Sequence, residues 1–106
     1  MIQSDKARAF AALHVPGRPL ILFNAWDAGT ARAVAAAGAT AIATGSWSVA
    51  AAHGFDDAER LPLDLAIANA ARIAAAVDLP VTIDFEGGYA VDPGRLAEHM
   101  GLLLAT

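Results

Sequence analysis

Apolar and polar side chains alternate most regularly between Pro80 and Glu86. A period of two is typical of a β-strand, and Pro80 comes first, where a strand tolerates proline. One face then carries Val81, Ile83 and Phe85, and the other carries Thr82, Asp84 and Glu86. The sequence therefore predicts a strand that ends with two carboxylates on one face, just before a Gly-Gly turn.

Apolar runs and helical periodicity predict the remaining elements. We expect an amphipathic helix over 4–13, with Ser4 as N-cap and Phe10 and Leu13 on its buried side. The continuous apolar run Leu20–Phe23 is typical of a strand covered on both faces, and a second strand is predicted at Thr40–Ala43. Further helices are predicted at 28–37 closed by Gly38, at 47–53 stopped by Gly54, from Pro62 or Leu63 to Val77, and from Asp92-Pro93 to Thr106.

Helices separate the three predicted strands, which indicates parallel pairing in an α/β fold. The βα units begin near residues 20, 40 and 80, within a single domain that spans 1–106. Polar residues follow each strand, and a parallel sheet brings such strand ends to one edge, where ligands bind. These polar strand ends are Asn24 to Asp27, Thr44 to Ser46, and Asp84 to Glu86.

Composition narrows the function classes. The 106 residues are 57% hydrophobic, carry a net charge of −4 and include no cysteine, which excludes disulfides and thiolate chemistry here. Scattered lysines and arginines predict no nucleic-acid partner and no binding to anionic membranes. The uncharged stretch Ala33–Ala52 is long enough to cross a bilayer, but small residues and turn glycines favour helix end, strand and helix start. The polar first residues do not resemble a signal peptide, and we expect a cytoplasmic location.

The spacing of Asp84 and Glu86 suits a Mg²⁺ site, since residues two apart in a strand lie roughly 6.5–7 Å apart. Mg²⁺ keeps several waters and takes one or two carboxylates. Asp27 precedes a helix, so it is either an N-cap or a third acid beside the metal. Ser46, between Gly45 and Trp47, is likewise either a cap or part of a backbone anion site.

Other polar and aromatic residues are interpreted more simply. Trp26 and Trp47 are expected to pack, and the histidines His14, His53 and His99 to lie at the surface or at helix ends. The acidic loop that contains Asp56, Asp57 and Glu59 is expected to be solvated, and a lid over the site is the alternative. Tyr89 either closes the site with its hydroxyl or packs the turn.

Three motifs together resemble the isocitrate lyase / phosphoenolpyruvate mutase superfamily, nearest its phosphoenolpyruvate mutase-like members. The motifs are 24–31 (Asn-Ala-Trp-Asp-Ala-Gly-Thr-Ala), Gly45-Ser46, and Pro80 to Tyr89. The resemblance runs from about Pro19 to Pro93. It departs from the family at Ala90, where the family turn carries glycine.

The resemblance implies a (β/α)₈ TIM barrel preceded by a short helix, of which this chain would be an N-terminal portion with three βα units. It implies Mg²⁺ or Mn²⁺ as cofactor, with Asp84 as direct ligand and Glu86 and Asp27 holding metal-bound waters. Gly45, Ser46 and Trp47 would bind the substrate carboxylate, and Asp27 and Tyr89 would be catalytic. The implied reaction cleaves or forms a C–C or P–C bond beside a 2-oxo acid or its enolate.

Several expectations follow from the implied barrel. A full barrel takes about 250 residues, so a later acid of the metal shell and a mobile catalytic loop would lie beyond Thr106. The substrate would be a small 2-oxo acid, carboxylate or phosphonate, and the full-length protein a homo-oligomer. Two alternatives stay open: an inactive remnant that oligomerises or binds a partner, and a small flavodoxin-like binding domain, which needs more strands than the pattern predicts.

Overall fold

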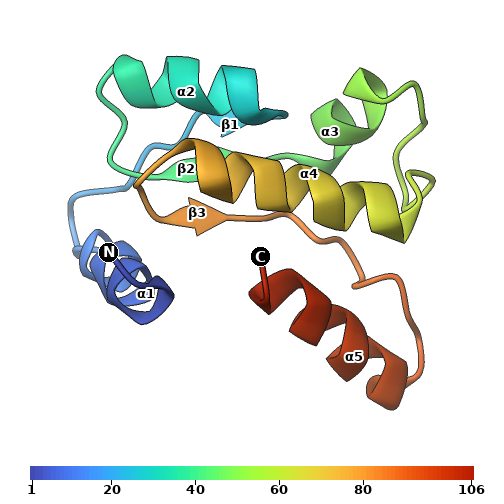
Figure 1. The fold of residues 1–106 in the computed structure, drawn as a ribbon. Helices are drawn as coiled ribbons and strands as arrows, with labels where there is room; N and C mark the ends of the chain where they lie inside the picture. Colours follow the sequence, from blue (N-terminus) through green and yellow to red (C-terminus); the bar gives the residue numbers. More distant parts are fainter.

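The computed structural model describes residues 1–106 and shows a small parallel sheet with five helices (Figure 1). The strands are β1 (Asn24–Ala25), β2 (Ile42–Thr44) and β3 (Val81–Thr82), in the order β1-β2-β3. Both strand pairs are parallel, with Ala25 opposite Thr44 and Ala43 opposite Thr82. The predicted α/β class and the parallel pairing are therefore confirmed.

The helices cover the sheet unevenly. Helices α2 and α4 pack on each other and on the sheet, whereas α1 and α5 lie beyond β3 (Figure 1). The fully buried core, Ala25, Ala31, Ile42 and Ile73, comes from β1, α2, β2 and α4. The helices are α1 (Gln3–Ala12), α2 (Ala28–Ala36), α3 (Ser46–Ala52), α4 (Leu63–Ala76) and α5 (Pro93–Leu104).

Local signals position most helix ends as predicted. Asp27 caps α2 and Asp92 caps α5, each by accepting the N–H three residues on. Gly38 and Gly54 follow α2 and α3 with φ of +103° and +83°, a conformation that favours glycine. The stretch Ala33–Ala52 indeed divides into helix end, strand and helix, and none of the helices has the length and apolar character of a membrane span.

The prediction for the first helix is wrong at its N-cap. The helix begins at Gln3, so Ile2 is the N-cap and Ser4 lies inside the first turn, without a capping hydrogen bond. Phe10 and Leu13, expected on the buried side of the helix, are both half-buried, and no residue of α1 is fully buried. The Phe10 ring contacts the ring of His14 edge-on. Contacts with distant segments favour the earlier helix start over a cap at Ser4. Lys6 Nζ lies 3.4 Å from Oδ1 of Asp78, and the Gln3 side chain donates a hydrogen bond to the Leu104 carbonyl.

The strands are shorter than predicted, and the first two are displaced toward the C-terminus. The run Leu20–Phe23 is irregular, with Ile21 and Phe23 74% and 72% exposed, because β1 pairs on one side only. The second strand is Ile42–Thr44 rather than Thr40–Ala43. The third keeps strand geometry only over Val81–Thr82, so the alternation expected through Glu86 does not continue.

Beyond β3 lies a groove between the sheet and the two outer helices. It has a volume of about 530 Å³ and is lined by residues of α1, β3, α4 and α5. The opposite edge of the sheet, at β1, carries the exposed Ile21 and Phe23 side chains. Both edges of the sheet are therefore apolar and unpaired.

Candidate functional site

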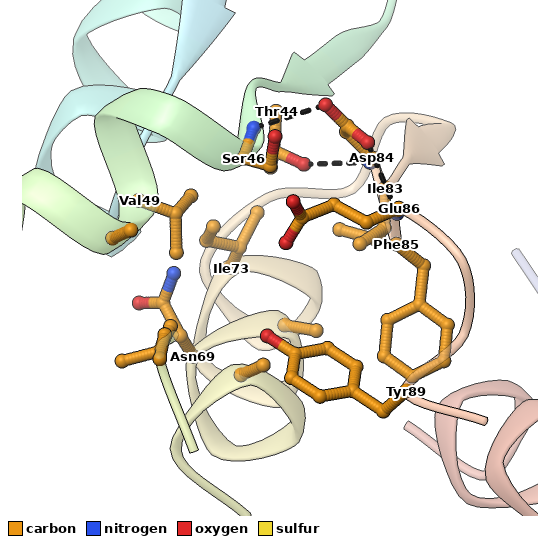
Figure 2. Close-up of a pocket in the computed structure, with 14 residues that line it drawn as sticks. Thr44, Ser46, Val49, Asn69, Ile73, Ile83, Asp84, Phe85, Glu86 and Tyr89 are labelled. Atoms are coloured by element: carbon orange, nitrogen blue, oxygen red, sulfur yellow. Dashed lines mark hydrogen bonds between the residues drawn. The ribbon is translucent and has the colours of Figure 1, made fainter. Parts of the chain in front are cut away.

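The ends of β2 and β3 meet at Asp84 (Figure 2). The backbone N–H of Asp84 donates to Oγ1 of Thr44 at 3.0 Å, and Ser46 N–H donates to Oδ2 of Asp84 at 3.0 Å. The Glu86 N–H donates to the other carboxylate oxygen, Oδ1, at 3.2 Å. Asp84 is therefore held from three directions at the carboxyl edge of the sheet, as the sequence predicts.

These contacts stabilise the ionised form of Asp84. The Ser46 N–H is the main cause that lowers the pKa of the Asp84 carboxyl, with a smaller contribution from the Glu86 N–H. Burial opposes the shift. Asp84 therefore keeps its negative charge at neutral pH, which a cation ligand needs.

The end of β1 joins the same edge through a close contact. Gly45, the N-cap of α3, leaves space for the Asn24 side chain; a Cβ atom at Gly45 would lie 2.7 Å from Asn24 Nδ2. Helix α3 begins at Ser46, not at Trp47, so Ser46 is its first residue rather than its cap. The Ser46 N–H, expected to face a substrate carboxylate, is bonded to Asp84.

Glu86 contacts the acidic loop that precedes α4. The Glu59 N–H donates to both oxygens of the Glu86 carboxylate, at 3.1 and 3.2 Å. Burial raises the pKa of Glu86, and the negative charges of Asp57 and Glu59 raise it further, although the Glu59 N–H acts in the opposite direction. The prediction of a solvated loop is therefore wrong for Glu59, which is half-buried.

Glu59 is the site residue that sequence reasoning missed, although a topological signal exists. Helix α4 runs back from the carboxyl edge to the start of β3, so the loop before α4 must lie at that edge (Figure 1). Acids in such a loop are therefore placed beside the acids that follow β3.

Tyr89 lies in the turn after Glu86, and its ring extends into the pocket (Figure 2). The ring contacts Phe85 at a centroid distance of 5.5 Å. Burial raises the pKa of Tyr89, and the charges of Glu86 and Glu59 add to this shift. The Tyr89 phenol is therefore protonated at neutral pH and can donate a hydrogen bond.

Asp27 is engaged as a helix cap. Its Oδ1 accepts the backbone N–H of Thr30 at 2.7 Å and the Thr30 hydroxyl at 2.8 Å, while the Asp27 N–H donates back to that hydroxyl. The Thr30 N–H is the main cause that lowers the pKa of Asp27, and the Thr30 hydroxyl and His53 contribute. Asp27 does not line the pocket beside Asp84, so the N-cap interpretation is confirmed.

Three expectations for other residues are wrong. Trp26 and Trp47 are 40% and 69% exposed rather than packed, because neither faces the core between the sheet, α2 and α4. His99 is not a surface residue: it is buried on α5, and its Nδ1 lies 2.8 Å from the carbonyl oxygen of Gly88. His99 therefore links α5 to the turn that contains Gly87 and Gly88.

The pocket between these groups is small. Its volume is about 30 Å³, enough for water but not for an organic acid. Polar groups from Thr44, Ser46, Asn69, Asp84, Glu86 and Tyr89 line it, together with apolar side chains of α3 and α4. Asn69 also donates to the Trp26 carbonyl at 3.1 Å, which ties α4 to the end of β1.

The donor set fits a hard divalent cation in part. No three His, Cys, Asp or Glu side chains come together as a metal site. Asp84 and Glu86 nevertheless supply carboxylate oxygens, which have lone pairs left beside the hydrogen bonds described above. A cation there would offset the charges of Asp57 and Glu59 that raise the pKa of Glu86. Mg²⁺ commonly takes only one or two carboxylates and keeps waters, so these residues fit it.

Comparison with known proteins identifies the family. The family model for phosphoenolpyruvate phosphomutase matches residues 10–106. The chain therefore belongs to the phosphoenolpyruvate phosphomutase family, and the resemblance to the isocitrate lyase / phosphoenolpyruvate mutase superfamily is confirmed.

Solved structures agree with this assignment, and a curated relative is similar over most of this chain. A Burkholderia cenocepacia J2315 protein, provisionally described as a phosphonomutase, is 50% identical with a TM-score of 0.94; the match covers 98% of this chain and 41% of that one. Another protein of that organism, provisionally described as a lyase/mutase, is 40% identical with a TM-score of 0.85, over 97% of this chain and 37% of that one. The uncharacterized protein Rv1998c of Mycobacterium tuberculosis is 38% identical over 95 residues. That match covers 90% of this chain, which spans only 36% of the relative's length.

Proposed function

We propose that this protein is an enzyme, dependent on Mg²⁺ or Mn²⁺, that cleaves or forms a C–C or P–C bond beside the 2-oxo group of a small acid or its enolate. The observation that carries the proposal is Asp84, an ionised carboxylate held by Thr44, Ser46 and Glu86 at the carboxyl edge of a parallel sheet. Membership in the phosphoenolpyruvate phosphomutase family supports the class of reaction.

The fold assigned under this proposal is part of a (β/α)₈ barrel. Three parallel strands in chain order, each followed by a helix, match the repeating unit of that barrel. Active sites of such barrels lie at the carboxyl ends of the strands, which is the edge that carries Asp84 and Glu86.

Asp84 and Glu86 would hold the metal ion, with Asp84 as direct ligand and Glu86 acting through water. The ion, when bound, would polarise the 2-oxo group and stabilise the negative charge of an enolate. Asp27 is the weaker candidate for the metal shell, because its carboxylate already binds Thr30.

The chain's own residues would bind and orient the substrate. Because Gly45 has no Cβ atom, another group can come close to the backbone at the start of α3. The Ser46 hydroxyl lies beside the Asp84 carboxylate. These groups and the exposed Trp47 would contact the substrate carboxylate. The protonated Tyr89 hydroxyl, directed into the pocket, can donate a hydrogen bond to a substrate oxygen (Figure 2).

The experiment that tests the proposal compares D84N with D64N. Both substitutions neutralise an exposed aspartate, but Asp64 lies in the first turn of α4, away from the pocket. Mg²⁺ affinity is measured by calorimetry, and turnover is assayed on 2-oxo acids and phosphonates with and without EDTA. We expect D84N to lose both properties and D64N to retain them. Metal-dependent turnover that survives in D84N would refute the proposal.

A second candidate function is that of an oligomerising or partner-binding piece. The exposed Ile21 and Phe23 at the free edge of β1 favour it, because unpaired apolar strands promote association. Sedimentation at several protein concentrations tests this candidate. A folded monomer at all concentrations would exclude self-association.

A further inference from the structure

The acidic loop before α4 and the turn after β3 bind each other reciprocally. The backbone N–H of Glu59 donates to the carboxylate of Glu86, at 3.1 and 3.2 Å. In return, Oε2 of the Glu59 side chain accepts the backbone N–H of Tyr89 at 2.7 Å. One residue of the loop thus engages the turn through both its backbone and its side chain.

The backbone geometry of the same two segments is unusual. Four residues other than glycine have positive φ: Ala58 (68°), Glu59 (61°), Glu86 (53°) and Tyr89 (60°). All four lie in the loop or in the turn. Left-handed conformations cost free energy in residues with a Cβ atom and persist only where the surroundings enforce them. The reciprocal hydrogen bonds supply that enforcement.

The glycines of the turn fit this arrangement. A Cβ atom at Gly87 would lie 3.5 Å from Oε2 of Glu59, so the Glu59 carboxylate sits directly against the turn. On the other side, the Gly88 carbonyl oxygen lies 2.8 Å from Nδ1 of the buried His99. The turn is therefore held on one side by the Glu59 carboxylate and on the other by His99 of α5.

We infer that Glu59 is a positioning residue: it fixes the Glu86 carboxylate and the backbone of the 86–89 turn before any ligand binds. The inference rests on the proposed function for the roles of Glu86 and Tyr89, but the contacts themselves do not depend on it. Glu59 acts through hydrogen-bond geometry, with its Oε2 occupied by the Tyr89 N–H. In this role Glu59 does not attract the cation through its negative charge.

The first test measures amide hydrogen exchange by NMR in metal-free protein with EDTA. E59A removes the acceptor of the Tyr89 N–H, whereas E59Q keeps an oxygen there and removes only the charge. E98A is the matched control, since Glu98 is an exposed glutamate on α5. We expect the Tyr89 amide to exchange about tenfold faster in E59A, the effect of losing one hydrogen bond, and at the wild-type rate in E59Q and E98A. Equal exchange in E59A and wild type would overturn the inference.

A milder variant keeps the test decisive if E59A fails to fold. E59D retains the charge but shortens the side chain by one methylene group, so its carboxylate falls short of the Tyr89 N–H. We expect faster exchange of Tyr89 in E59D than in E59Q. The reverse order would show that charge, not hydrogen-bond geometry, holds the turn, and would overturn the inference.

The second test measures Mg²⁺ affinity by calorimetry on the same variants. We expect E59A and E59D to bind Mg²⁺ more weakly and E59Q to retain most of the wild-type affinity. If E59Q loses as much affinity as E59A while the Tyr89 amide stays protected, Glu59 acts as a charge and the inference is wrong. If the wild type itself binds no Mg²⁺, the proposed function fails, but the exchange experiment still decides whether Glu59 positions the turn.

Discussion

The Thr44 hydroxyl accepts the backbone N–H of Asp84 at 3.0 Å. Thr44 lies one residue beyond the last position of β2 that pairs with β3, and Asp84 lies two residues beyond the last paired position of β3. The backbone pairing ends at Ala43 and Thr82, and the side chain of Thr44 takes over the role of a strand partner. This contact sets the direction in which the chain leaves β3. It therefore sets where the carboxylate of Asp84 lies.

We predict that T44V destabilises the protein by about 1 kcal/mol, because valine keeps the shape of threonine but leaves the Asp84 N–H without its acceptor. Urea denaturation measures the loss. The Asp84 amide should also exchange faster in T44V but not in T44S, which keeps the hydroxyl. Equal exchange in both variants would show that the hydroxyl does not hold Asp84.

A side chain at Gly88 is predicted to destabilise the protein. Its φ of +71° favours glycine, and a Cβ atom would overlap Cδ1 of Leu96. G88A should therefore cost at least about 1–3 kcal/mol in the free energy of unfolding. The matched control is G101A, inside α5 with open space around the added methyl group, which should gain about 0.5–1 kcal/mol. Similar stabilities for the two variants would contradict this account.

Asp27 is predicted to act on stability through its cap. D27A should lower the free energy of unfolding by about 1 kcal/mol, while D27S, which preserves a cap oxygen, should lose less. Mg²⁺ calorimetry on the same pair separates the cap from the metal-shell role that the family resemblance implies. If Asp27 acts only as a cap, the Mg²⁺ affinity is unchanged in D27A and D27S. If Asp27 belongs to the metal shell, the Mg²⁺ affinity is weaker in both variants.

Glu86 gives a pH-dependent prediction for metal-free protein. Its pKa in the folded state is raised above the ordinary value of 4.5, so the folded state binds this proton more tightly than the unfolded state does. Stability therefore falls as pH rises from the unfolded pKa through the raised folded pKa, and then stays lower. E86Q has no carboxylate to ionise, so its stability does not fall in this way. The free energy of unfolding of E86Q relative to wild type should therefore rise as pH increases from the unfolded to the folded pKa of Glu86.

Urea denaturation between pH 4 and pH 7 in EDTA measures this difference. E98Q, at an exposed glutamate of α5, is the matched control for removing one surface carboxylate. A pH-independent difference for E86Q would mean that the environment of Glu86 does not disfavour its charge.

Local signals were sufficient where one segment determines its own structure. The cap at Asp27, the stops at Gly38 and Gly54 and the Asp92-Pro93 helix start all depend on neighbours within a few residues. Strand limits depend on a partner that the sequence does not name. The apolar run that contains Ile21 and Phe23 predicts a buried strand, yet without pairing on its outer side it stays irregular and exposed.

The candidate site divides in the same way. Asp84, Glu86 and Ser46 could be predicted because strand ends of a parallel sheet converge. Glu59 could not be assigned from local pattern, since its partners Glu86 and Tyr89 lie 27 and 30 residues further along the chain. The buried His99 was missed for a similar reason: its hydrogen bond to Gly88 depends on how α5 docks.

The order of the strands has a consequence for synthesis on the ribosome. Each strand pairs with the next one in the chain, so β1, β2 and β3 can be added to the sheet in the order in which they are translated. Ser46 lacks its partner until Asp84 has emerged, and Glu59 lacks its full set of partners until Tyr89 has emerged. The nascent chain can therefore build its scaffold step by step, whereas the acidic edge forms only when the third unit arrives.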